Sequence, residues 1–208
     1  MIRKKALIYG AGCQDGIYLA KYLIENKYTV HGICKHKKFN NIKNLDILKK
    51  IKVNIFPKFN KKKLANLLKK NFNEIYFLGE ETSIKNSEIY NNEIAPMKSI
   101  LNFIVLQKGK KSKLLYRANS KMYGNISYKK KFTKMDKKKP ITPYGLSKFI
   151  GYEIIKSYRR MFNLPICTVI LFKQEHEKIA NRFHKILNSK KIEDYIIAPD
   201  NKVLLKRI

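Results

Sequence analysis

Tyr144 and Lys148 have the residue types and the spacing that proton transfer requires. They are four positions apart within 143–162, where the sequence pattern predicts a long helix, so both side chains would lie on one helical face. A nearby ammonium group favours the phenolate form of a tyrosine, which can then exchange a proton with a substrate hydroxyl near neutral pH. The same spacing is common by chance, so its meaning depends on the fold in which it occurs.

A glycine-rich turn at 10–16 follows the first apolar run of the chain and precedes a helical pattern. In such a strand–turn–helix unit the backbone N–H groups can approach a pyrophosphate at the N-terminus of the helix. A turn with a purely structural role is the alternative. The candidate cofactor-binding residues in this turn are Gly10, Cys13, Gln14, Asp15 and Gly16.

The end of the second predicted strand bears on the choice of nicotinamide cofactor. NAD sites usually place an acidic residue about 20 positions beyond the glycines, where it holds the ribose hydroxyls. Residues 34–38 contain three lysines and no acid, and positive charge suits a 2′-phosphate. The sequence therefore favours NADP, with Lys35 as a candidate contact. The alternative is that these lysines only share the general lysine excess of the chain.

The elements that would position these residues alternate along the chain. Strands are predicted at 4–10, 28–34, 52–56, 74–79, 113–118 and 165–172. Helical patterns lie between them, and their alternation predicts an α/β fold with a Rossmann-type doubly wound parallel sheet. The remaining stretch, 173–208, holds one helical pattern at 179–188 and one possible strand at 194–205, too little for a domain of its own.

The composition excludes several classes of protein. Hydrophobic residues make up 44% of the 208 residues, which excludes a disordered or collagen-like chain. No apolar run approaches the ~20 residues of a membrane-spanning helix, and the N-terminal run has the length of a strand rather than of a signal peptide. Cys13, Cys34 and Cys167 form no paired motif. Neither a disulfide framework nor a metal site is predicted, and the expected compartment is reducing and cytoplasmic.

The chain is strongly basic. It contains 46 lysines and arginines against 15 acidic residues, a formal net charge of +31, which normally suggests a polyanionic partner. Only six of the 46 are arginines, although phosphate and base recognition favour arginine. Because lysine, asparagine and isoleucine all have A/T-rich codons, we interpret the excess as compositional drift. Nucleic-acid binding is the alternative.

Short segments spread along the chain match the pattern of one known family. The matching segments are Lys5-Ala6-Leu7-Ile8-Tyr9-Gly10, Gln14-Asp15-Gly16, Tyr18-Leu19-Ala20, Val30-His31-Gly32-Ile33, Glu74-Ile75-Tyr76 with Leu78, Ser120 with Met122-Tyr123-Gly124, Pro143-Tyr144 with Lys148, and Ile170-Leu171-Phe172. Together they resemble the GDP-mannose 4,6-dehydratases among the extended short-chain dehydrogenase/reductases. The resemblance runs from about residue 3 to 190. It implies an NADP-binding Rossmann-like domain over 1–172 and the start of a truncated sugar-nucleotide-binding region over 173–208.

This resemblance also implies an activity and roles for the site residues. Such an enzyme oxidises C4 of the mannose with NADP⁺, eliminates water across C5–C6 and returns the hydride to C6. Tyr144 would be the general base at C4, and Lys148 its partner on the cofactor ribose. The implied partners are GDP-mannose or a related sugar nucleotide and further copies of the chain. The apolar residues that could serve such pairing, or simply core packing, are Phe149, Ile150, Ile154 and Ile155.

The chain departs from the family pattern at several site positions. The family's active-site hydroxyl falls on Asn119 and its elimination carboxylate on Lys121, and an ammonium group is a poor acceptor for the C5 proton. Cys13 replaces a glycine of the phosphate-binding turn. The other departures are Phe56-Pro57-Lys58, Gly79-Glu80-Glu81 and Lys173.

Three hypotheses follow from these matches and departures. The first is an active GDP-mannose 4,6-dehydratase, in which Glu80 or Glu81 could replace the lost carboxylate. The second is an impaired or truncated relative that folds and at most binds NADP. The third is a basic nucleic-acid-binding protein on the same scaffold.

Overall fold

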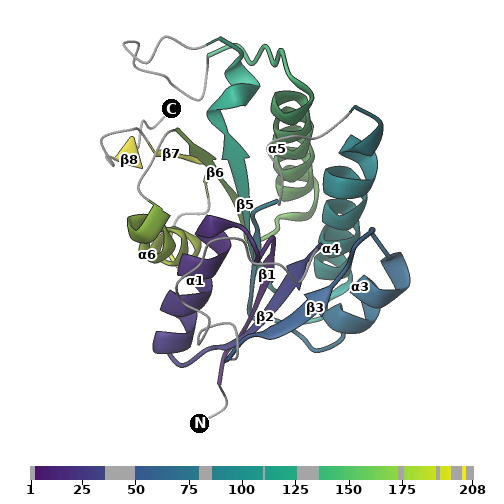
Figure 1. The fold of residues 1–208 in the computed structure, drawn as a ribbon, viewed down its shortest axis with the longest axis vertical. Helices are drawn as coiled ribbons and strands as arrows, with labels where there is room; N and C mark the ends of the chain where they lie inside the picture. The colour runs from purple at the N-terminus through teal and green to yellow at the C-terminus, as the bar shows by residue number, and fades with distance from the viewer. Residues whose placement is uncertain are drawn as a thin grey trace.

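One sheet forms the centre of the molecule (Figure 1). The computed structural model describes residues 3–35, 50–79, 86–109, 111–125, 136–172, 176–190, 193–197 and 203–204. The strands are β1 (Lys5–Tyr9), β2 (Thr29–Cys34), β3 (Lys52–Ile55), β4 (Glu74–Phe77), β5 (Lys113–Asn119), β6 (Ile166–Leu171), β7 (Tyr195–Ile197) and β8 (Val203–Leu204). Their order is β3-β2-β1-β4-β5-β6-β7-β8, and every neighbouring pair is parallel except β7–β8.

Helices cover both faces of this sheet. On one face lie α1 (Gln14–Glu25) and α6 (His176–Leu187), and on the other lie α3 (Lys61–Leu68), α4 (Ala95–Leu106) and α5 (Pro143–Phe162) (Figure 1). A 3₁₀ turn at Asn86–Glu88 and a π-helical turn at Tyr90–Ile94 lead into α4, and another 3₁₀ turn, η3 (Ser120–Tyr123), follows β5. The strand order reverses beside β1, so the predicted doubly wound parallel sheet is confirmed.

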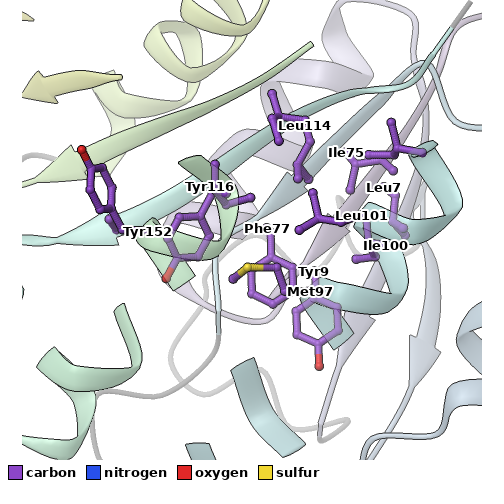
Figure 2. Packing of buried hydrophobic residues seen from close by; sticks show 14 of the residues in the cluster. Leu7, Tyr9, Ile75, Phe77, Met97, Ile100, Leu101, Leu114, Tyr116 and Tyr152 are labelled. Carbon is purple, nitrogen blue, oxygen red and sulfur yellow. The ribbon is translucent and has the colours of Figure 1, made fainter. Parts of the chain in front are cut away.

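The strands are buried because their side chains pack into two hydrophobic cores, one on each face of the sheet. Leu7 and Tyr9 of β1 face α3 and α4, whereas Ala6 and Ile8 face α1. Figure 2 shows the first core, where the Tyr9 and Phe77 rings stack with centroids 4.5 Å apart. The apolar face of α4 supplies the opposite wall of this core: Met97, Ile100, Leu101 and Ile104 are fully buried.

All six predicted strands are present, but the C-terminal stretch differs from the prediction. The expected single strand at 194–205 is wrong: β7 and β8 are two short antiparallel strands in register through Ile196–Leu204 and Ile197–Val203. The two apolar runs are separated by Pro199-Asp200-Asn201-Lys202, and proline, aspartate and asparagine are turn formers, so the sequence did contain a signal for the reversal. Of the four apolar residues considered for pairing, Ile155 is fully buried in the core, and Phe149 and Ile154 pack against it.

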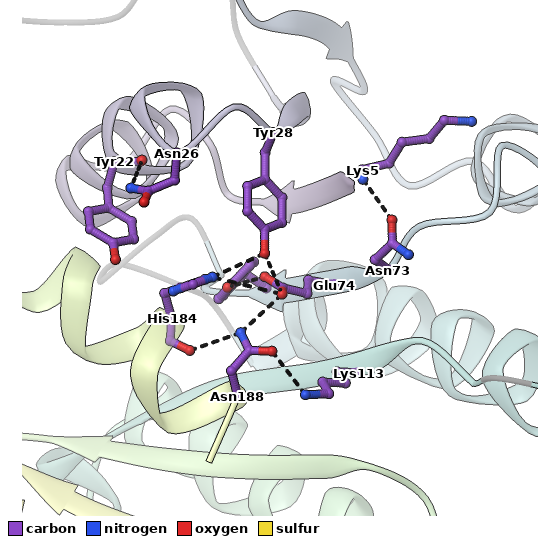
Figure 3. A network of polar contacts seen from close by, with 10 residues as sticks. Lys5, Tyr22, Asn26, Tyr28, Asn73, Glu74, Lys113, His184 and Asn188 are labelled. Atoms are coloured by element: carbon purple, nitrogen blue, oxygen red, sulfur yellow. Dashed lines mark hydrogen bonds and ion pairs between the residues drawn. The ribbon is translucent and has the colours of Figure 1, made fainter. Parts of the chain in front are cut away.

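A polar network joins the amino-terminal end of the sheet to α6 (Figure 3). Glu74 opens β4 and is buried, and its carboxylate accepts hydrogen bonds from Tyr28 Oη at 2.9 Å and Tyr76 Oη at 2.7 Å. Asn188 Nδ2, just beyond α6, donates to the same carboxylate at 3.0 Å. His184 Nε2 lies 3.1 Å from Tyr28 Oη. These hydrogen bonds therefore hold the C-terminal end of α6 against the start of β4.

Among the described residues, no helix is long and apolar enough to cross a membrane. Within the same ranges, no group of three or more histidine, cysteine or acidic side chains could hold a metal ion.

His31 is a buried ionisable group in β2. Its ring packs edge-on against Phe72 with centroids 5.2 Å apart, and only 3% of the residue is exposed. Burial, followed by the positive charges of Lys70, Lys52 and Lys5, lowers its pKa from the ordinary 6.5 to about 4. In the described structure its Nδ1 atom has no hydrogen-bond partner. The folded protein therefore holds this imidazole neutral.

We expect this histidine to make the fold sensitive to acid. Between pH 6.5 and about 4 the unfolded chain binds a proton at His31 that the folded chain does not, so stability falls as pH falls through that window. The loss is up to about 3 kcal/mol. Urea unfolding at pH 7 and at about pH 4.5, which lies within that window, measures the change in the free energy of unfolding. This change should be smaller for His31→Leu than for the unsubstituted protein.

Phe72→Leu is the matched control, because it disturbs the same ring contact and keeps the titrating group. It should lower stability at both pH values and leave the pH dependence unchanged. Equal pH dependence in His31→Leu and the unsubstituted protein would contradict the assignment.

Candidate active site

The residues singled out in the sequence meet at the carboxyl ends of β1, β4 and β5. In open α/β sheets this edge, at the point where the strand order reverses, is where ligands bind. The β1–α1 turn, Gly79 after β4, the turn η3 after β5 and the first turns of α5 all lie there. The fold thus brings together segments that are far apart in sequence: Asp15 and Arg117, which pair here, are 102 positions apart.

Tyr144 and Lys148 lie on one face of α5. The helix begins at Pro143, and Thr142 caps it by accepting a hydrogen bond from Gly145 N at 3.0 Å. Lys148 Nζ is 5.6 Å from the centre of the Tyr144 ring, as the four-residue spacing predicts. Both side chains are buried, Lys148 with only 2% of its surface exposed.

Glu93 is the ionic partner of Lys148, and sequence reasoning did not identify it. Its Oε1 lies 2.7 Å from Lys148 Nζ and also accepts a hydrogen bond from Tyr116 Oη at 2.8 Å. Burial, and then Glu93, raises the pKa of Tyr116. One signal was available: Glu93 precedes Met97 by four positions and Ile100 by seven, so it lies on the buried face of the α4 pattern.

Gly79 makes room for this ion pair. Its φ is +72°, and a Cβ atom there would lie 2.5 Å from Lys148 Nζ. A Cβ atom on Gly10, whose φ is +92°, would in turn lie 2.2 Å from the Gly79 carbonyl oxygen. Glycine at these two positions therefore lets the β1–α1 turn, the end of β4 and α5 approach each other closely.

The β1–α1 turn ends in a cap made by a cysteine. Cys13 is the N-cap of α1, and its Sγ accepts a hydrogen bond from Gly16 N at 3.3 Å. The thiol thus takes up one of the backbone N–H groups at the start of the helix. Gln14 is exposed, and Lys35 is half-buried just beyond β2.

Asp15 points into the protein and pairs with Arg117. Arg117 Nε lies 2.8 Å from Asp15 Oδ2, and the guanidinium also donates to the Leu78 carbonyl at 3.3 Å. Burial by itself lowers the pKa of Arg117, but Asp15 and further negative groups together offset this and raise it above the ordinary value. The pair ties the glycine-rich turn to β5, a role that the sequence did not indicate.

Asn119 and Lys121 lie beside the first turn of α5. Asn119 Oδ1 accepts a hydrogen bond from Lys121 N at 2.9 Å and caps η3, while the Lys121 side chain is exposed. A Cβ atom on Gly145 would lie 2.5 Å from the Lys121 carbonyl oxygen, so η3 and the residue after Tyr144 are in close contact. Glu80, Glu81 and Lys173 lie outside the described residues.

The fold is shared with sugar-nucleotide epimerases and dehydratases. A structure of UDP-glucuronic acid 4-epimerase from Bacillus cereus, solved with UDP-glucuronic acid and NAD, aligns with a TM-score of 0.76 and 19% identity over 93% of this chain and 77% of that one. dTDP-glucose 4,6-dehydratase from Bacillus anthracis, solved with NAD, aligns with a TM-score of 0.78 and 14% identity over 96% of this chain and 76% of that one.

The chain belongs to the GDP-mannose 4,6-dehydratase family, whose model, described as GDP-mannose 4,6 dehydratase, matches residues 7–203. It is 28% identical to the GDP-mannose 4,6-dehydratase of Vibrio cholerae serotype O1 over 202 residues, 88% of this chain and 53% of that enzyme. It is 30% identical to the enzymes of Cricetulus griseus and Homo sapiens over 199 residues. The chain thus spans about half the length of the curated relatives it matches.

We expect the Asp15–Arg117 pair to be energetically coupled. Arg117→Met should destabilise the fold by about 3 kcal/mol, because it leaves a buried carboxylate without its counter-charge. Asp15→Asn should also destabilise it, and the double variant should lose much less than the sum of the two. Urea unfolding of the four proteins measures this coupling. Additive losses would show that the two side chains do not stabilise each other.

Proposed function

We propose that this chain is the cofactor-binding part of a GDP-mannose 4,6-dehydratase that acts on GDP-mannose or a related sugar nucleotide with NADP. Residues 1–172 would form the NADP-binding domain, and 173–208 would begin the sugar-nucleotide-binding region. The observation that carries the proposal is the Tyr144–Lys148 pair, in a chain of this family. Lys148 Nζ lies 5.6 Å from the centre of the Tyr144 ring, at the edge of the sheet where ligands bind in such folds.

The glycine-rich turn fits a dinucleotide. A Cβ atom on Gly10 would meet the Gly79 carbonyl and one on Gly16 would meet the Gly10 carbonyl, so the two glycines let the turn pack closely against β4 and against itself. The Asp15 carboxylate is turned away toward Arg117, which leaves the N-terminus of α1 without that negative charge. Lys35 would contact the 2′-phosphate. The residues that would hold the pyrophosphate through the turn are Gly10, Cys13, Gln14, Asp15 and Gly16. When bound, the nicotinamide would accept a hydride from the substrate and later return it.

Tyr144 would move the proton in the first step. Its phenol oxygen would take the proton of the C4 hydroxyl as C4 is oxidised, and the ammonium of Lys148 favours the phenolate form that can do so. Lys148 would also orient the cofactor ribose. Asn119 would offer a hydrogen bond where the family has a hydroxyl.

Elimination is the step for which the chain is least equipped. Lys121 would stand where the family's carboxylate removes the C5 proton, and a charged ammonium cannot accept a proton. A slow elimination after an intact oxidation is therefore the expected behaviour.

Pairing of two copies through the helices that flank the sheet also belongs to this proposal. At the end of α5, Met161 and Phe162 are exposed by 65% and 41%, although both are large apolar residues. Such residues support an interface more readily than Ile155, which the core of the same chain already buries.

NADP⁺ should bind more tightly than NAD⁺, by roughly tenfold, which is the strength of a hydrogen bond between a lysine and a phosphate. Lys35→Ser should narrow the difference. Lys69→Ser is the control, because Lys69 is exposed beyond α3 at the opposite end of the strands. Titration calorimetry of the three proteins with both nucleotides measures the six affinities. Equal affinity of the unsubstituted chain for NADP⁺ and NAD⁺ would reject the cofactor assignment.

The chain should form at most traces of the 4-keto-6-deoxy product from GDP-mannose and NADP⁺. Loss of a general base slows a step by ~10²–10⁴-fold, and a substrate misplaced by ~1 Å costs about another 10²-fold. When these 208 residues are tested alone, which match about half of the relative's length, Lys121→Glu should restore little. Product analysis of both proteins, with Tyr144→Phe as the inactive control, is the measurement. Robust turnover by the unsubstituted chain would mean that another group has become the base.

A further inference from the structure

The ammonium group of Lys148 occupies a closely defined position. It lies 5.6 Å from the centre of the Tyr144 ring and 5.6 Å from the centre of the Tyr116 ring. Its one described hydrogen bond goes to Glu93 Oε1, at 2.7 Å. Lys148 and Glu93 are 2% and 4% exposed, so water does little to weaken this contact.

Three features of the fold hold Glu93 against this ammonium. Glu93 belongs to the π-helical turn Tyr90–Ile94, an irregularity that is frequent at functional sites. Tyr116 Oη donates a second hydrogen bond to the same carboxylate oxygen. Gly79 leaves open the space beside the ammonium, and Glu93 Oε2 would lie 3.4 Å from a Cβ atom at that position.

The charged groups around Tyr144 are balanced. Lys148 on α5 and Arg117 on β5 are positive, whereas Glu93 before α4 and Asp15 on α1 are negative and pair with them at 2.7 and 2.8 Å. The Tyr116 hydroxyl completes the group from β5. Removing the charge of Glu93 alone would leave Lys148 as a buried cation without a counter-charge, which is strongly unfavourable.

We propose that Glu93 is the positioning residue of the Tyr144–Lys148 pair: its carboxylate holds the Lys148 ammonium group between the two tyrosine rings, in the space that Gly79 leaves open. The functional meaning of this role rests on the proposed function, because it is the charged Lys148 that would favour the Tyr144 phenolate. One of the three N–H donors of the ammonium is then committed to Glu93. The others are left for ribose hydroxyls.

The test measures how fast Lys148 reacts, without requiring catalysis. Amines are methylated reductively by formaldehyde only in their neutral form, and peptide mapping by mass spectrometry gives the rate at each lysine. In Glu93→Gln the carboxylate that favours the charged form is gone while the side-chain shape is kept. Lys148 should then react roughly tenfold faster, the lower range for loss of a hydrogen bond between charged groups. Lys156, on the same helix, serves as the internal reference.

Two variants separate the charge of Glu93 from loosened packing. Glu93→Asp keeps the charge but shortens the side chain, so Lys148 should react more slowly there than in Glu93→Gln, whereas loosened packing predicts the reverse. Tyr116→Phe keeps the Glu93 carboxylate and removes one of its hydrogen bonds, so it should raise the rate by only about two- to threefold, and this can be measured even if Glu93→Gln does not fold. An unchanged rate in Glu93→Gln, a faster rate in Glu93→Asp than in Glu93→Gln, or a tenfold rise in Tyr116→Phe would overturn the proposal.

Glu74→Gln is the matched control. Glu74 is also a buried glutamate that accepts a tyrosine hydroxyl, but its partners are Tyr28, Tyr76 and Asn188 at the other end of the strands. It should leave the Lys148 rate unchanged, and acceleration there would count against Glu93. Adding NADP⁺ tests the proposed function separately. Protection of Lys148 from methylation supports cofactor binding, and lack of protection contradicts it while leaving the role of Glu93 standing.

Discussion

The close approach of three backbone segments at Gly10 and Gly79 is the constraint on which the candidate site depends. A Cβ atom at Gly10 would meet the Gly79 carbonyl at 2.2 Å, and one at Gly79 would meet Lys148 Nζ at 2.5 Å. Both residues also have positive φ angles, which glycine adopts without strain. Glycine at these two positions therefore lets the glycine-rich turn lie against the end of β4 and leaves room beside it for the Lys148 side chain of α5.

Charge inside the site is organised differently from charge on the chain as a whole. The formal net charge is +31, yet the buried groups around Tyr144 form two neutral pairs, Asp15–Arg117 and Glu93–Lys148. Unpaired charges are costly to bury, so each buried cation requires its own carboxylate. Among the described residues Lys148 is the one lysine in the buried class, so the overall lysine excess tells little about the electrostatics at this site.

The family relationship and the site chemistry lead to different expectations for the two halves of the reaction. In the proposed reaction the Tyr144–Lys148 pair would serve the oxidation step, and both of its side chains are buried and closely packed. The position expected to carry out elimination holds an exposed lysine, on a turn that Asn119 caps with its own side chain. Descent from a dehydratase therefore does not by itself establish a complete dehydratase cycle, because function belongs to the site.

Local pattern in the sequence determined the strands, the long helix α5, the glycine-rich turn and the common face of Tyr144 and Lys148, because each depends on residues a few positions apart. Only the tertiary structure decided the rest. Glu93 reaches Lys148 across 55 positions, and Asn188 reaches Glu74 across 114, so no local pattern could pair them. The reversal between β7 and β8 is different, because Pro199, Asp200 and Asn201 between the two strands are turn formers that a local pattern could have identified. Which charge meets which in a buried site is set by the order of strands in the sheet, and that order brings distant segments to the same edge.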